Sequence, residues 1–276
     1  MPVQNCDSSD LPAATRVFYR HALAELSESG IPFMICGSYA LAEYTQLGRS
    51  TRDLDVLVCK EDCSEALAVL SAAGYSAEVV FPHWLAKIRS GDDCMDVIFN
   101  SGNGICVVDQ SWFVHARRSE LFGVPVLICP PEEALWQQSF IMERERFDGA
   151  DVIHLIHAQG KQLNWDRLLR RFGEHWRVLL SHLILYGFVY PAERDAVPEI
   201  VMQQLMSRLQ KETMLRPWDG ASICQGTLLS RAQYLGDLRH GNYIDARLLP
   251  PGTMTEEDVQ IWTAAIQQPA AACVPG

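Results

Sequence analysis

Residues 33–58 read FMICGSYALAEYTQLGRSTRDLDVLV, and this run sets the architecture that we expect for the chain. Its apolar first part predicts a short buried strand over 33–36, after which Gly37 turns the chain and Ser38 can cap a helix over 39–47. Its last part predicts a strand over 53–59 that opens with two acids, Asp53 and Asp55. Because side chains two residues apart on a strand point to the same face, these carboxylates converge.

A third acid, Asp96, lies in a second apolar run, CMDVIF at residues 94–99. It can reach Asp53 and Asp55 only if its strand pairs alongside theirs. Burying three carboxylates among aliphatic residues without a counter-charge costs several kcal/mol or forces protonation. No basic residue lies inside either run. Since Mg²⁺ prefers oxygen ligands, the three acids predict a Mg²⁺ site with a nucleoside triphosphate (NTP) beside it.

These residue types suit the transfer of a nucleotidyl group. Two Mg²⁺ ions about 3.5–4 Å apart can neutralise the triphosphate, stabilise the leaving pyrophosphate and activate an acceptor hydroxyl. We expect Asp53 and Asp55 to contact metal, and Asp96 to bind the acceptor-side ion and act as, or orient, the general base. Gly37 permits close backbone approach, so Ser38 and the N–H groups after Gly37 are expected to hold the β- and γ-phosphates.

Other candidates for the site are less specific. Lys87, in an expected strand over 84–89, either contacts a phosphate or faces solvent. Arg146, Asp148 and Asp151 either line the cleft or, in the case of Asp148, cap the helix that starts at Gly149. The basic residues between 161 and 177 either guide an anionic acceptor such as tRNA or form a solvated helix face; they are Lys161, Arg167, Arg170, Arg171 and Arg177.

The hydrophobic pattern of the sequence changes at Pro130-Pro131, from a mixture of strand and helix patterns to helical periodicity alone. Before it, helices are expected at 11–29, 39–47 and 61–73, and strands at 33–36, 53–59, 77–81, 84–89, 94–99 and 124–129. After it, the periodicity is helical, with helices expected at 132–144, 149–158, 165–172, 176–189, 199–211 and 256–267. The sequence therefore predicts an α+β domain over 1–130, with a mixed sheet flanked by helices, and a helical domain over 131–276 that closes the active-site cleft.

The chain resembles the DNA polymerase β-like nucleotidyltransferase superfamily. The matching residues are Gly37-Ser38, the run RSTRDLDV at 49–56 and Asp96 in the place of the third carboxylate. The resemblance covers residues 31–100 and extends more loosely to 130–156, where RERFDGAD stands at 144–151. It implies a nucleotidyltransferase fold, Mg²⁺ dependence and an NTP donor. It also implies that Arg49 and Thr51 belong to the nucleotide-binding part.

Arg49 and Thr51 ahead of the two acids look like the branch that holds small bacterial nucleotidyltransferases. This branch includes antibiotic-modifying enzymes and abortive-infection toxins, so an antitoxin is a candidate partner. The acceptor hydroxyl can belong to a small molecule, a tRNA or a protein. A catalytically silent nucleotide-binding or regulatory protein of the same fold is the alternative.

The length, net charge and cysteine content of the chain limit which classes of protein it can belong to. With 276 residues, 48% of them hydrophobic, the chain can bury one good core or two modest ones. The net charge of −11 argues against binding of duplex DNA as the main function. The nine scattered cysteines match no disulfide framework or zinc site, and no stretch has the length of a membrane span. We therefore expect a cytoplasmic protein without a membrane partner.

Overall fold

The structure is a computed structural model and describes residues 11–47, 53–215 and 222–267. The chain divides into two compact units. The described residues up to Pro130, together with those from Arg247 onward, form the first unit. The second unit runs from Pro131 to Ala246.

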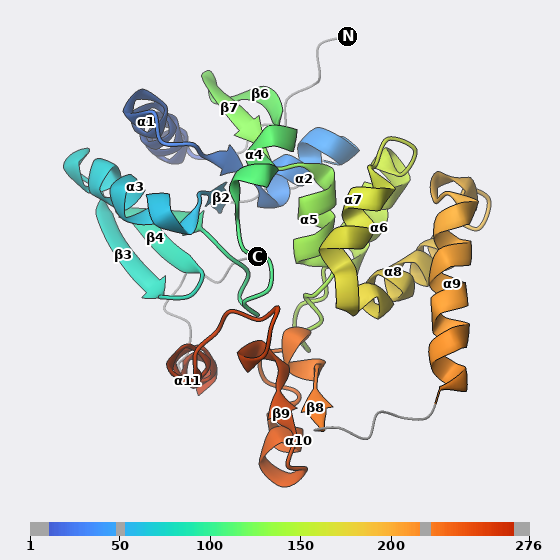
Figure 1. The fold of residues 1–276 in the computed structure, drawn as a ribbon. Coiled ribbons are helices and arrows are strands. Elements are labelled where there is room, and N and C mark those ends of the chain that lie inside the picture. Colours follow the sequence, from blue (N-terminus) through green and yellow to red (C-terminus); the bar gives the residue numbers. More distant parts are fainter. Residues whose placement is uncertain (1–10, 48–52, 216–221, 268–276) are drawn as a thin grey trace. The chain divides into compact units, whose positions relative to one another are not determined.

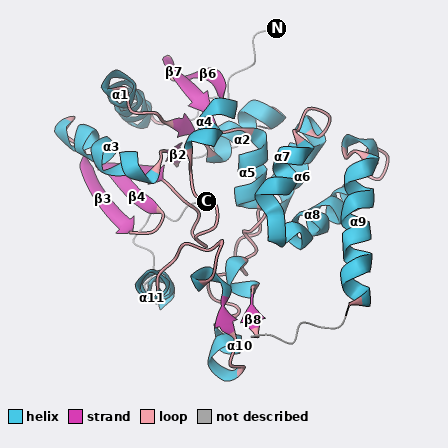
Figure 2. Ribbon diagram, in the orientation of Figure 1, coloured by secondary structure: helices cyan, strands magenta, loops and turns pink. Residues whose placement is uncertain are grey.

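The first unit is built on a seven-stranded mixed sheet (Figures 1 and 2). Its strand order is β3-β4-β5-β2-β1-β7-β6. The pairs β2–β5 and β1–β7 are parallel, and the other neighbours are antiparallel. The strands are β1 (Met34–Ile35), β2 (Leu54–Leu57), β3 (Ser76–Phe81), β4 (Leu85–Ser90), β5 (Asp93–Ile98), β6 (Arg117–Leu121) and β7 (Val124–Ile128).

Alternation along the central strands fixes which face of the sheet each side chain takes. In β2, Leu54 and Val56 are fully buried, and in β5, Met95 and Val97 are fully buried. The residues between them, which include Asp55 and Asp96, point to the other face. The hairpin that the sequence predicts between 84–89 and 94–99 is present as β4 and β5.

The first unit also contains helices, most of which contact the sheet. They are α1 (Ala13–Ser29), α2 (Gly37–Thr45), α3 (Lys60–Ala72), α4 (Gln110–His115) and α11 (Glu256–Ala264). α1 contacts α3, β5 and β7, and its residues Leu23 and Leu26 are fully buried, as is Leu70 of α3. α1 ends where Gly30 adopts a left-handed conformation with φ +77°, which glycine reaches without strain.

The C-terminal segment belongs to the first unit rather than to the helical one. The Thr253 hydroxyl donates to the Gly104 carbonyl at 2.7 Å and accepts from the Asn100 amide at 3.0 Å. Trp262 of α11 meets Phe81 edge-on, with ring centroids 4.6 Å apart. The sequence predicts one helical domain from residue 131 to residue 276. Aromatic contacts and hydrogen bonds between residues so far apart in the chain leave no local sequence pattern, so the position of this segment could not be predicted.

The second unit is mainly helical. It contains α5 (Pro131–Gln138), α6 (Gly149–Gln159), α7 (Trp165–Phe172), α8 (Trp176–Val189), α9 (Glu199–Met214) and α10 (Leu235–His240), with a two-stranded sheet of β8 (Ile223–Cys224) and β9 (Ile244–Asp245). The expected helix over 132–144 is too long. It ends at Gln138, because a tight turn closed by the Met142↔Phe147 bridge uses the backbone groups that a helix would need.

The predicted fold class is confirmed: a mixed sheet flanked by helices precedes a helical region. The sequence missed α4, β6, α10 and the small sheet of β8 and β9. In β6, RRSEL has no apolar alternation, and its strand conformation comes from pairing with β7. This is a case in which tertiary pairing overrides local propensity.

α8 contains the longest apolar stretch of the chain, and the sequence predicts a helix over the same residues, 176–189. Six of its residues are buried, among them Leu179, His182 and Tyr186. Within the described ranges, none of the helices combines the length and the apolar character that crossing a bilayer requires.

Two buried histidines make the second unit sensitive to acid. Burial lowers the pKa of His175 and of His182, and the hydrogen bond between His182 Nε2 and the Ser139 carbonyl opposes the shift only in part. A lowered folded-state pKa stabilises the fold above pH about 6.5 and loses that stabilisation as the pH falls, since the unfolded chain takes up the protons first.

We therefore predict that the free energy of unfolding of the second unit falls below pH about 6.5, by up to about 1.4 kcal/mol per pH unit for each histidine. Urea unfolding monitored by tryptophan fluorescence between pH 5 and 8 measures this slope. His182→Gln should flatten it, because glutamine keeps a donor for Ser139 but does not titrate. An unchanged slope in this variant would contradict the assignment.

Candidate functional site

The strand register brings two of the predicted carboxylates opposite each other. Asp55 of β2 pairs with Asp96 of β5 in a parallel arrangement, so both side chains point to the same face. Asp53 lies on that face too: its Oδ1 is 3.8 Å from the thiol of Cys94, which is two residues before Asp96. The strand pairing that the predicted site requires is therefore present.

Gly37 lies directly against the Asp55 carboxylate. The Cys36 N–H donates to the Asp55 carbonyl at 2.9 Å, which ties the start of α2 to β2. Gly37 has φ +59°, and a Cβ atom at this position would lie 1.8 Å from Asp55 Oδ2. Only glycine leaves room for this contact. Gly37 and the half-buried Ser38 are the first residues of α2, where backbone N–H groups lack partners within the helix.

Lys87 does not face solvent, and it has an acidic partner that the sequence did not predict. It lies in β4 directly opposite Asp96 and is only 8% exposed, and its Nζ donates to Asp96 Oδ1 at 2.7 Å. The counter-charge that is missing from β2 and β5 thus comes from the next strand. The predicted hairpin contained the signal, because pairing Ser90 with Asp93 also sets Lys87 opposite Asp96.

Burial and charge act against each other in this ion pair. Burial raises the pKa of Asp96, the Lys87 ammonium opposes this rise, and the negative charge of Asp53 adds to it. Burial alone would lower the pKa of Lys87, but the Asp96 carboxylate more than offsets that effect and raises it. Lys87 is therefore protonated at neutral pH. Further positive charge beside Asp53 and Asp96 would favour the ionised carboxylates.

The predicted metal group is not assembled as a three-ligand cluster. Within the part of the chain that the structure describes, no three or more His, Cys, Asp or Glu side chains are placed to hold one ion. Asp53 and Asp55 nevertheless match the one or two carboxylates that Mg²⁺ usually takes from a protein, the remaining ligands being water and phosphate oxygens. The donor set of this strand therefore fits Mg²⁺. Arg49 and Thr51 lie outside the described residues.

The remaining predicted residues belong to the second unit. Arg146 and Asp148 form a two-pronged ion pair, with Nε–Oδ1 at 2.9 Å and Nη2–Oδ2 at 2.8 Å. Asp148 occupies the N-cap position of α6, but its side chain makes no capping hydrogen bond. Asp151 is buried in the first turn of α6. A role for these residues in lining the cleft stays a prediction.

The basic residues between 161 and 177 form a basic patch, and most of them pair with acidic side chains. Lys161 pairs with Asp195, and Arg177 pairs with Glu212. Arg167 and Arg171 both pair with Glu133, which is fully buried at the start of α5, and Arg167 also contacts Glu132. These pairs link α5 to α7. The arginines in these pairs therefore have a structural role that does not require an anionic acceptor.

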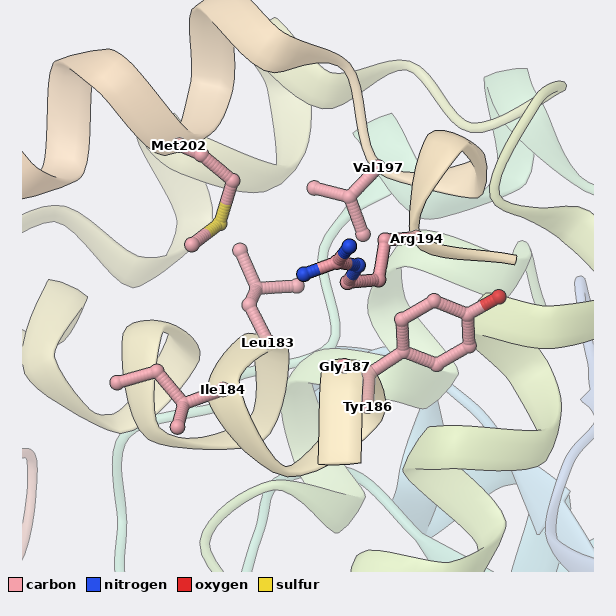
Figure 3. Close-up of a pocket in the computed structure, with 7 residues that line it drawn as sticks. All are labelled: Leu183, Ile184, Tyr186, Gly187, Arg194, Val197 and Met202. Atoms are coloured by element: carbon pink, nitrogen blue, oxygen red, sulfur yellow. The ribbon is translucent and has the colours of Figure 1, made fainter. Parts of the chain in front are cut away.

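The second unit also has a hollow of about 270 Å³ (Figure 3). Its lining comes from α8, from the start of α9 and from the segment between them, and consists of Leu183, Ile184, Tyr186, Gly187, Arg194, Val197 and Met202. None of the residues that the sequence predicts for the site lines it. The apolar lining favours a packing groove between α8 and α9 over a site for triphosphate chemistry.

Similar folds occur among solved structures of nucleotidyltransferases. The antibiotic-resistance factor ANT(2'')-Ia is 15% identical, with a TM-score of 0.42, covering 62% of this chain and 98% of its own. The lincosamide antibiotic adenylyltransferase LnuA is 16% identical, with a TM-score of 0.38, covering 51% and 94%. An antigenic nucleotidyltransferase-like protein from Paracoccidioides brasiliensis is 16% identical, with a TM-score of 0.36, covering 61% and 91%.

No protein-family model matches this chain, and no curated protein matches it. Two of these similar structures are named as an adenylyltransferase and a nucleotidyltransferase-like protein. At TM-scores below 0.5, they add no argument about what this chain does.

The contact between Gly37 and Asp55 yields a prediction with a close control. Gly37→Ala places a methyl group where Asp55 Oδ2 lies, so the carboxylate must move, and we expect a loss of about 10²-fold or more in any activity that uses it. Gly91 has a nearly equal φ of +61° but open space around it. Gly91→Ala should therefore cost only about 1–2 kcal/mol of backbone strain.

Urea unfolding and a transfer or metal-binding assay on both variants separate the two effects. Equal losses of activity in Gly37→Ala and Gly91→Ala would mean that strain, and not the Asp55 contact, explains the glycine at position 37.

Proposed function

We propose that this chain is a Mg²⁺-dependent nucleotidyltransferase that moves a nucleoside monophosphate from an NTP to an acceptor hydroxyl and releases pyrophosphate. The observation that carries the proposal is the placement of Asp55. Its carboxylate lies against Gly37 at the start of α2, and its strand position is opposite Asp96. A helix start and several carboxylates thus meet at one face of the sheet.

The start of α2 suits the triphosphate. Cys36 occupies the N-cap position without a side-chain capping bond, so the first N–H groups of the helix are not capped by that residue. N–H groups at a helix start attract phosphate through hydrogen bonds and the helix dipole. We assign the backbone at Gly37 and the hydroxyl of Ser38 to the β- and γ-phosphates. Arg49 and Thr51 join them in the proposal through the sequence resemblance.

Asp53 and Asp55 are the residues proposed to hold Mg²⁺, and Asp96 can contribute its Oδ2 oxygen to a second ion. When bound, Mg²⁺ neutralises the triphosphate charge and stabilises the charge that develops on the leaving pyrophosphate. Asp53 and Asp55 are half-buried. A carboxylate pair in such a place binds a cation more strongly than the same pair in bulk water would.

The proposed reaction is a substitution at the α-phosphorus. The acceptor oxygen forms a bond to this phosphorus, and the bond from the phosphorus to the oxygen that bridges to the β-phosphate breaks. The proton of the acceptor hydroxyl passes to Asp96 Oδ2, and pyrophosphate leaves. Positioning and charge stabilisation supply most of the rate enhancement in such a site.

The acceptor class stays open among a small hydroxylated molecule, a tRNA and a protein. The ion pairs of the basic patch weaken the support for tRNA. A cytoplasmic location is part of the proposal, since the nine scattered cysteines of the sequence match no disulfide framework. A toxin role with an antitoxin partner is a branch of this proposal that the sequence resemblance alone supports.

A catalytically silent nucleotide-binding or regulatory protein is the second candidate. One observation favours it: Lys87 already neutralises Asp96. In such a protein, the start of α2 would bind nucleotide while Asp96 and Lys87 form a structural ion pair.

Incubation with each α-³²P-labelled NTP, Mg²⁺ and a mixture of total RNA, protein and metabolites tests the proposal. We predict that label moves to one acceptor fraction, that chelation of Mg²⁺ stops the transfer, and that Asp55→Asn lowers its rate by about 10³-fold or more. Asp195→Asn, which removes an exposed carboxylate of the second unit, is the matched control and should keep the wild-type rate.

Nucleotide binding without transfer to any fraction would select the silent protein instead. Transfer that survives in Asp55→Asn would contradict the assignment of the site.

A further inference from the structure

We propose that Lys87 is a positioning residue for Asp96, which it holds by one carboxylate oxygen so that the other faces the reacting groups. This inference rests on the proposed function and deepens it. It also replaces the sequence-based expectation that Lys87 binds a phosphate.

The ion pair is fixed by the backbone on both sides. Lys87 and Asp96 are directly paired residues of the β4–β5 hairpin, and the register runs without a break from Ser90↔Asp93 to Leu85↔Ile98. Their side chains are only 10% and 5% exposed. A long lysine side chain on an exposed strand samples many rotamers, whereas here burial and the neighbouring strand hold it in one place.

The hydrogen bond uses only one side of the carboxylate. Lys87 Nζ donates to Asp96 Oδ1, and Asp96 Oδ2 makes no hydrogen bond with any residue that the structure describes. Asp55 is the parallel partner of Asp96, so the Oδ2 oxygen belongs to the same face as the Asp55 carboxylate. A carboxylate that is tied at one oxygen keeps a defined orientation for a metal ion or an acceptor proton at the other.

A phosphate role for Lys87 conflicts with this geometry. The ammonium is largely buried and already donates to Asp96, and if it left Asp96 for a triphosphate, that carboxylate would be buried without its counter-charge. Breaking one side of a buried ion pair is strongly unfavourable. Arg89, two residues later on the same face and half-buried, is a cation that can serve an anionic substrate without this cost.

Lys87→Arg is the decisive variant, because it keeps the charge and changes the geometry. The planar guanidinium presents two parallel N–H groups that engage both oxygens of a carboxylate. It would therefore cover Asp96 Oδ2. We predict that Lys87→Arg folds, keeps its KM for NTP, and loses about 10–100-fold both in kcat and in Mn²⁺ affinity, as is typical when a partner of a metal-binding carboxylate is changed.

Mn²⁺ affinity is measured without turnover by water-proton relaxation in the presence of α,β-methylene-ATP. Lys87→Met, which removes the hydrogen bond altogether, should show the same direction of change, and thermal unfolding reports whether it folds. Arg118→Met is the comparison, since it removes an exposed cation from β6, the strand at the opposite edge of the sheet from β3, without touching the bond to Asp96. It should bind Mn²⁺ with close to the wild-type affinity.

Two results would overturn the proposal: wild-type kcat and Mn²⁺ affinity in Lys87→Arg, or a raised KM for NTP with an unchanged kcat in the folded Lys87 variants. The second pattern is that of a phosphate contact. Failure of the proposed function looks different, because the wild-type protein itself would transfer nothing. The Mn²⁺ titration still tests Lys87 in that case, and a wild-type protein that binds no Mn²⁺ would overturn both proposals.

Discussion

The register of β5 between its two neighbours is the constraint on which the candidate site depends. β5 pairs antiparallel with β4 and parallel with β2, so Lys87, Asp96 and Asp55 form a row across three strands. Backbone hydrogen bonds set this row, and burial of Met95 and Val97 on the opposite face secures it. A slip of one residue would expose this apolar pair and turn Asp96 into the core, so the core and the site are specified together.

The face of the sheet that carries this row has more negative than positive charge. Three carboxylates, those of Asp53, Asp55 and Asp96, share this face, and the Lys87 ammonium is hydrogen-bonded to one of them. Burial raises the pKa of Asp96, and the charge of Asp53 adds to this effect. A further cation on this face would relieve the repulsion, which supports the proposed Mg²⁺ site. Because Asp55 lies against Gly37, a cation bound by this carboxylate would lie next to the start of α2.

The sequence predicted the parts of the fold that depend on local patterns. The apolar run before Gly37, the strand that follows Asp53 and the hairpin of β4 and β5 can all be predicted from alternation and turn residues. The ion pair of Lys87 with Asp96 was not predicted, because neither acid-bearing strand contains a basic residue and the partner of Asp96 comes from the facing strand of the hairpin. The C-terminal segment could not be placed, because the contact of Trp262 with Phe81 joins residues far apart in the chain.

The most direct test of the central claim is the anomalous scattering of Mn²⁺ in crystals grown with α,β-methylene-ATP. The account predicts an Mn²⁺ peak in contact with Asp53 and Asp55 beside Gly37, with the triphosphate at the start of α2 and Lys87 still bonded to Asp96 Oδ1. A bound nucleotide with no Mn²⁺ peak at these carboxylates, or a Lys87 ammonium on the phosphates, would contradict it.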